Sequence, residues 1–318
     1  MSAGLTRRRF VWSLGAAVCL PRYAPAAEWN QSSAFQAFYN LDYDTAIESL
    51  EREVRSSDGD PGPYNHLAYG VLYRALFRAD ALEGAVALSP KAFLGKPKVP
   101  MDAGDRARFD RALENARNLS WDRLKKNPNN ADALYTLGVS ELHRANLLFL
   151  VEKEWRPALK QAGEARRLHN QAYTRDQNLV DALLVPSVHE YVVGSLPFYL
   201  KAIGFLVGFS GDKSKGVQGI QQVARQGRRT RVEARVLAAL VERREHRPAN
   251  ALEIMKGLAA EFPSNHLYRM EVVRLMAALK RHADGEAELQ QLTHARYRHL
   301  GKDKLELFRQ EWQKLRRG

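Results

Sequence analysis

Cysteine is almost missing from this sequence, which has a single one, Cys19, among 318 residues. Because Cys19 lies in the first 26 residues, the rest of the chain has no thiol for a disulfide, a thiolate metal site or a cysteine nucleophile. The residue before it, Val18, is not the small residue that normally precedes a lipidated cysteine, which argues against a lipoprotein anchor. We therefore expect side-chain packing, not covalent cross-links, to stabilise the fold.

Catalytic sequence motifs are missing as well. The chain has no His-Glu-x-x-His zinc motif and no Gly-x-Ser-x-Gly nucleophile motif, and its nine histidines are scattered. The glycine-rich stretch from Gly208 to Gly216 lacks the Gly-Lys-Ser/Thr ending of a phosphate-binding loop, so we interpret it as a turn in which Asp212 caps the next helix. We predict a protein without enzymatic activity, metal or cofactor.

The sequence also lacks long stretches in which polar and apolar residues alternate, as they do in β-strands. From Ser33 onward apolar residues recur every three or four positions, which is typical of amphipathic helices. Turn-forming residues separate these periodic segments at five places, 58–63, 89–100, 127–130, 208–212 and 262–265. We therefore predict an all-α fold of antiparallel helix hairpins.

A repeat-like pattern lies near the C-terminus. Ala251, Met255, Leu258 and Pro263 are spaced by four, three and five residues. This spacing resembles the second helix of a tetratricopeptide repeat, a helix pair of about 34 residues that has a small residue at the helix contact and a proline at its end. The resemblance implies stacked helix pairs that form an α-solenoid, and an unrelated helical bundle is the alternative.

Two further segments resemble the same repeat. One runs from Tyr43 to Pro61 and has Ala46 at the small position, with Leu50 one turn later. The other runs from Asn127 through Leu137 to Gly138, where glycine takes the small position. The resemblance implies that the helices approach each other closely at Ala46 and Gly138.

The middle of the chain departs from the repeat pattern. An insertion rich in Pro and Gly, Leu88–Asp105, interrupts the second helix pair. A helix that begins near Ala131 is expected to continue past Phe149 toward Trp155, which is longer than a standard repeat allows. Residues 191–209 are the most apolar stretch, and we predict that they form a buried central hairpin; insertion into a membrane is the alternative.

The first 26 residues resemble an export signal. Arg7, Arg8 and Phe10 follow the order of a twin-arginine signal, and a short apolar run precedes Ala24 and Ala26, which suit a signal peptidase. We predict a signal peptide over 1–26 and a periplasmic location. General secretion, an N-terminal membrane anchor and a basic cytoplasmic start are the alternatives.

The charge of the chain is strongly positive. Loss of residues 1–26 would remove four arginines and no acidic residue, so the formal net charge would fall from +13 to +9. The excess gathers in Arg225–Arg235 and in residues 301–318, which we predict to be a basic helix or tail after a repeat domain of residues 27–300. Export argues against nucleic acid, so lipid headgroups, anionic envelope polymers or an acidic protein are the expected partners, unless these residues are solvated helix faces.

The repeat resemblance also implies a binding surface, because the first helix of each pair lines the concave face of such solenoids. The matching positions are Asn65, Tyr69, Tyr73, Tyr135, Val139 and His143. Tyrosine combines a large contact area with a polar tip, which suits recognition of a peptide or small ligand, and packing in the core is the alternative. The Lys and Asn by which chaperone-binding repeats hold a carboxylate are absent at Tyr135 and Val139.

These observations together favour a binding protein. We predict a non-catalytic interaction scaffold that binds a protein or peptide of the cell envelope. One alternative is a ligand-binding accessory subunit of a transporter, which a closed apolar cavity near residues 191–209 would favour. The other is an exported enzyme that acquires a cofactor before export.

Overall fold

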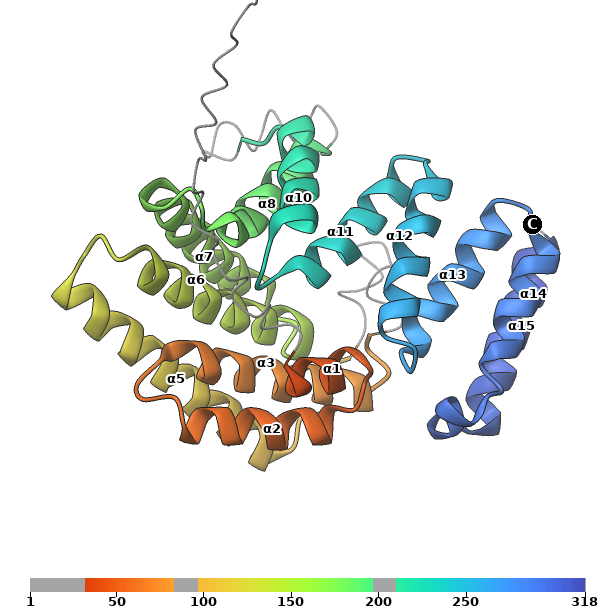
Figure 1. Ribbon diagram of the computed structural model, residues 1–318, viewed down its shortest axis with the longest axis horizontal. Coiled ribbons are helices and arrows are strands. Elements are labelled where there is room, and N and C mark those ends of the chain that lie inside the picture. Colours follow the sequence, from red (N-terminus) through yellow and green to blue (C-terminus); the bar gives the residue numbers. More distant parts are fainter. Residues whose placement is uncertain (1–31, 83–96, 197–209, 318) are drawn as a thin grey trace, which may run out of the picture.

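Thirteen α-helices account for most of the residues that the computed structural model describes, which are 32–82, 97–196 and 210–317 (Figure 1). No β-strand occurs in these ranges. The helices are α1 (Ser33–Tyr39), α2 (Tyr43–Arg55), α3 (Pro61–Arg78), α5 (Ala103–Lys126), α6 (Ala131–Asn146), α7 (Trp155–Arg175), α8 (Leu184–Gly194), α10 (Lys213–Gln226), α11 (Arg231–Arg244), α12 (Pro248–Glu261), α13 (His266–Ala278), α14 (His282–Gln291) and α15 (Gly301–Arg317).

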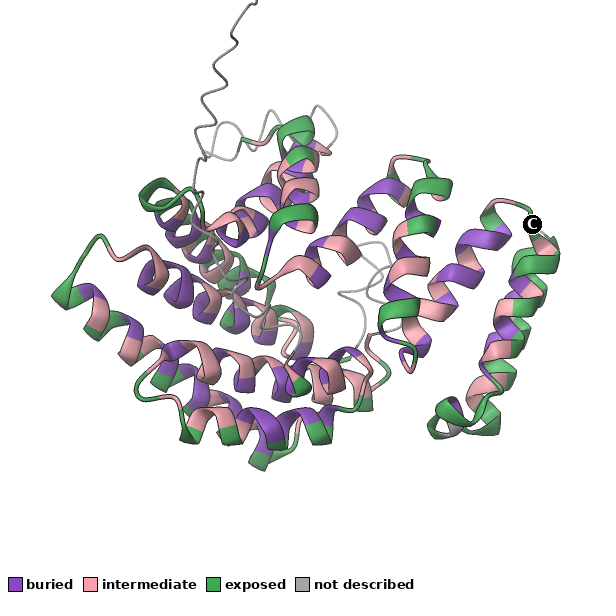
Figure 2. Ribbon diagram, in the orientation of Figure 1, coloured by how far each residue is buried: buried purple, intermediate pink, exposed green. Residues whose placement is uncertain are grey.

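Each helix packs mainly against its neighbours along the chain, and the helix pairs follow a curved path (Figure 1). Buried residues lie on the helix sides that face other helices, and exposed residues lie on the outward sides (Figure 2). The prediction of an all-α fold is therefore confirmed, and the packing of adjacent helix pairs is compatible with an α-solenoid.

Side-chain caps explain where many of the helices begin. Six of them follow an Asp or Asn whose side chain accepts a hydrogen bond from a free backbone N–H of the first turn. These residues are Asp42, Asp60, Asp102, Asn130, Asp212 and Asn265. The predicted cap at Asp212 is confirmed, since its Oδ1 accepts from the Lys215 N–H at 3.1 Å.

The helix expected from Ala131 past Phe149 is confirmed as far as Val151, although its last five residues change to a π-helix and it stops short of Trp155. Helix α6 ends at Asn146, a wider π-type turn covers Leu147–Val151, and α7 begins only at Trp155. Between them Lys153 has a φ of 60°, a left-handed conformation that ends a helix. Because such a residue is usually glycine, a lysine at this position carries no sequence signal.

The insertion expected over Leu88–Asp105 ends earlier than predicted. Residues 97–102 have no regular secondary structure, and Val99 donates its N–H to the Val151 carbonyl at 3.0 Å. Asp102 then caps α5, so Asp105 already belongs to that helix. Residues 88–96 of the predicted insertion lie outside the described ranges.

The segments chosen for their repeat-like spacing lie on helices that pack in the core. Ala251, Met255 and Leu258 are buried in α12, and Pro263 follows the end of that helix. Gly138 of α6 is in close contact with α7, because a Cβ placed on it would lie 2.5 Å from His169 Nδ1. Gly138 is thus at a tight helix contact, and Ala251 is fully buried.

The first helix of the described chain meets the C-terminal half. The Asn265 side chain donates to the Tyr39 carbonyl at 2.6 Å, and the Ser264 N–H donates to Asn40 Oδ1 at 2.9 Å. The rings of Tyr39 and Phe262 lie 4.9 Å apart. The end of α1 therefore contacts the turn between α12 and α13, and one hydrophobic core joins both parts of the chain.

The C-terminal segment, predicted to be a helix or a tail, forms the helix α15. Phe308 and Trp312 are buried in a core that α15 shares with α13 and α14. Arg309 and Arg316 pair with Glu306 and Glu286, so part of the basic charge is compensated.

The predicted central hairpin over residues 191–209 is described only as far as Leu196. Tyr191 is buried against Ile220 and Val223 of α10. Residues 197–209 lie outside the described ranges. Over the ranges that are described, no helix combines the length and the apolar character needed to cross a membrane.

Candidate binding site around Glu233

Three of the five predicted binding residues are buried, and two of these, Asn65 and Tyr135, join neighbouring helices. Asn65 is only 1% exposed; its amide donates to the Thr136 carbonyl at 2.8 Å and its Oδ1 accepts from the Ser140 hydroxyl at 2.7 Å. Tyr135 is 4% exposed and lies against His169 and the guanidinium of Arg229. Asn65 joins α3 to α6, and Tyr135 packs between α6 and α7, so neither offers an open surface.

Besides Asn65 and Tyr135, the other three predicted residues lie together. The rings of Tyr69 and Tyr73 on α3 are 4.4 Å apart, and Tyr69 stacks on His143 of α6 at 5.2 Å. His143 is buried, whereas Tyr69 and Tyr73 are partly exposed. Tyr69 and Tyr73 therefore lie on one partly exposed side of α3, and the buried His143 packs against Tyr69.

A carboxylate that sequence reasoning missed lies at the centre of this surface. The hydroxyl of Tyr39 donates to Glu233 Oε1 at 2.6 Å, and the hydroxyl of Tyr69 donates to the same oxygen at 3.2 Å. Tyr268 of α13 lies close enough that the Glu233 charge, after burial, raises its pKa. We call Glu233, Tyr39, Tyr69, Tyr73 and Tyr268 the Glu233 cluster.

Glu233 is held in place by the turn that precedes α11. The buried carboxylate of Asp181 accepts hydrogen bonds from the backbone N–H groups of Arg229 and Thr230, each at 2.8 Å. These bonds compensate for free amides before the start of the helix. Since Glu233 is in the first turn of α11, Asp181 fixes the position from which its side chain reaches α1 and α3.

Burial dominates the electrostatics of Glu233. It raises the pKa of the carboxyl group, which the hydrogen bond from Tyr39 lowers in part. Glu233 Oε2 is buried, and within the described ranges it has no hydrogen-bond partner. Burial likewise raises the pKa of Tyr39 and Tyr69, so their hydroxyls stay protonated and act as donors.

The arginines near Glu233 form ion pairs with other acidic residues. Arg235 and Arg231, on the same helix as Glu233, pair with Glu261 of α12. Arg229 pairs with Asp132 at 2.7 Å. Three arginines of the expected basic stretch therefore join helices to one another, while Arg225 and Arg228 are exposed.

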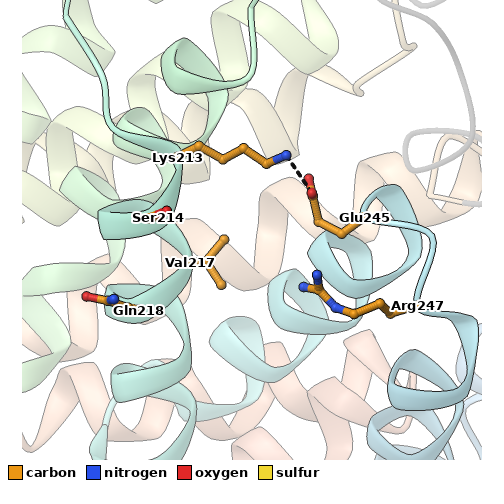
Figure 3. Close-up of a pocket in the computed structure, with 6 residues that line it drawn as sticks. All are labelled: Lys213, Ser214, Val217, Gln218, Glu245 and Arg247. Carbon is orange, nitrogen blue, oxygen red and sulfur yellow. Dashed lines mark ion pairs between the residues drawn. The ribbon is translucent and has the colours of Figure 1, made fainter.

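A second location is a shallow recess between α10 and the end of α11 (Figure 3). Its volume is about 410 Å³, and its lining includes Lys213, Val217, Glu245 and Arg247. Lys213 pairs with Glu245 across the recess at 2.5 Å, and Arg247 pairs with Glu242 at 2.6 Å. Because these charges already compensate one another, nothing in the recess points to a particular ligand.

Metal ligands are not grouped in the part of the chain that is described. No three side chains of His, Cys, Asp or Glu there lie close enough to hold one ion. His266 and His299 do approach each other, with 3.2 Å between ring nitrogens, but no carboxylate completes a set with them among these residues.

Comparison with known proteins gives no family for this chain. No protein-family model matches the sequence, and a search of curated proteins found no match.

Proposed function

We propose that the protein is a non-catalytic binding scaffold of the tetratricopeptide type. In this proposal it is exported to the periplasm and holds a protein or peptide of the cell envelope against the Glu233 cluster. One observation carries the proposal: α1, α3, α11 and α13, from both ends of the chain, contribute tyrosines and a carboxylate to one cluster, in which all but Tyr39 are partly exposed.

The chemistry of this surface favours recognition. Tyrosine rings offer contact area at a small cost in side-chain entropy, and their hydroxyls orient polar groups of a ligand. Tyr69 and Tyr73 are already packed against each other and against Phe38, so little further ordering is needed when a partner binds. The alternative of a transporter accessory subunit depends on a cavity near residues 191–209, most of which lie outside the described ranges.

A site-specific cross-link tests the proposal. A photoreactive phenylalanine analogue replaces Tyr73 in the full chain in cells, and the same analogue at exposed Arg111 of α5 is the matched control. We expect a discrete cross-linked species from position 73, absent from position 111 and competed by excess unlabelled protein. The proposal is wrong if position 73 gives no cross-link beyond that of position 111.

A further inference from the structure

The surroundings of Glu233 suit a carboxylate that pairs with a positively charged group. Its Oε1 accepts two tyrosine hydroxyls, while its buried Oε2 has no partner in the described ranges. A buried charge is normally paired, because its removal from water costs several kcal/mol. An unpaired carboxylate charge at a partly exposed cluster therefore indicates that its counter-charge belongs to a bound ligand.

The chain itself does not supply this group from the described residues. No described Lys or Arg forms an ion pair with Glu233, and Arg231 and Arg235 are turned to Glu261. The charge of Asp181 adds a small further rise to the Glu233 pKa, so it does not compensate the carboxylate. The missing partner of Oε2 is therefore a donor that carries positive charge.

The aromatic rings around Glu233 suit the same kind of group. Tyr69 is already stacked on Phe38 and on His143, and Tyr39 is only 4% exposed, so Tyr73 and Tyr268 offer the rings that are available to a ligand. The faces of tyrosine rings attract ammonium and guanidinium groups, most strongly where water is excluded. A carboxylate together with these two rings offers a cation both an ion pair and ring contacts.

We infer that the Glu233 cluster binds the ammonium or guanidinium group of a ligand. The inference rests on the proposed binding function and specifies its chemistry. A Lys or Arg side chain of a bound peptide and a free polyamine are two sources of the same group. A neutral or anionic ligand would leave Oε2 without a charged donor.

Calorimetric titration of the full chain separates these sources. The probes are the peptide acetyl-Gly-Lys-Gly-amide, the same peptide with norleucine for lysine, and spermidine. We expect the lysine peptide or spermidine to bind and the norleucine peptide not to bind. Because a charge-assisted hydrogen bond and its ion pair are lost, Glu233→Gln should weaken that binding about tenfold or more. Binding of the peptide alone assigns the site to a partner protein, and binding of spermidine alone assigns it to a small amine.

Two further variants distinguish a loss of ligand binding from a loss of folding. Tyr69→Phe retains the ring and removes one hydroxyl, so it should weaken binding by less than Glu233→Gln. Glu114→Gln, at an exposed position of α5, should bind as the wild type does. The inference is overturned if neither amine binds, or if Glu233→Gln binds as tightly as Glu114→Gln. In that event a cross-link from position 73 would still support the scaffold, so the two proposals fail separately.

Discussion

Glu233 lowers the stability of the folded protein when it is ionised. Since burial raises its pKa above the ordinary value of 4.5, the folded chain holds this proton more tightly than the unfolded chain does. Below pH 4.5 both states are protonated and the penalty vanishes; as the pH rises through the folded pKa, stability is lost. A residue that destabilises its own fold is typical of a functional site.

This dependence of stability on pH gives the first prediction. Glu233→Gln should unfold at higher urea than the wild type at pH 7, by on the order of 1 kcal/mol, and the difference should shrink toward pH 4. Urea unfolding followed by circular dichroism at several pH values measures it. A variant less stable than the wild type at pH 7 would mean that Glu233 is a structural residue.

Three histidines, the partly exposed His66 and the buried His143 and His169, have the opposite dependence on pH. Burial lowers the pKa of His66 and His143 to about 3 and that of His169 to about 4, from an ordinary value of 6.5. These side chains are neutral in the fold and become protonated first in the unfolded chain. Their contribution to stability is present above pH 6.5 and is lost as the pH falls toward the folded values.

The second prediction follows from these histidines. Stability should fall steeply between pH 6 and pH 4, with each histidine contributing about 1.4 kcal/mol per pH unit in that interval. His143→Phe keeps a ring beside Tyr69 and removes one titrating group, so its curve of unfolding free energy against pH should be less steep. Parallel curves for the variant and the wild type would exclude His143 as a cause of acid unfolding.

At the scale of the helices, small residues set how closely neighbours approach. Gly138 faces His169 and Leu168 of α7, and Ala251 is fully buried in α12. The third prediction is that Gly138→Leu and Ala251→Phe each destabilise the fold by about 1 to 3 kcal/mol through overpacking. Gly163→Leu on α7 is the control, because a Cβ there meets no atom within 4 Å. Thermal unfolding of all three variants decides whether these contacts are tight.

Helix starts could be predicted from this sequence, and several helix ends could not. Asn130 and Asp212 precede their helices with side chains that accept backbone hydrogen bonds, which is a local and specific signal. The ends at Lys153, His246 and Lys280 have a left-handed backbone without glycine. At such positions the tertiary fold imposes a conformation that the residue itself disfavours, so the sequence carries no mark of it.

The candidate site was predictable only in part for a related reason. Tyr69 and Tyr73 are four residues apart on one helix, and their helical spacing alone places them on one face. Glu233 joins them across a separation of 164 residues from Tyr69. No local pattern specifies that approach, because it depends on the curvature that the whole series of helix pairs builds up.

At the scale of the whole molecule, export gives the fourth prediction. Replacing Arg7 and Arg8 by lysine should leave the uncleaved precursor in the cytoplasm, because lysine lacks the planar guanidinium that the twin-arginine receptor recognises. Immunoblots of fractionated cells measure the ratio of precursor to mature protein. An unchanged periplasmic yield would rule out this route and leave general secretion as the alternative.

The contact between α1 and the turn before α13 also determines when the Glu233 cluster is complete. Tyr39 and Asn265 are 226 residues apart, and the entropy of closing so long a loop makes this contact one of the last to form during folding. Tyr39 also donates a hydrogen bond to the Glu233 carboxylate. A nascent or partly unfolded chain therefore has no complete Glu233 cluster, and on the proposed function a partner would bind only after the turn before α13 has joined α1.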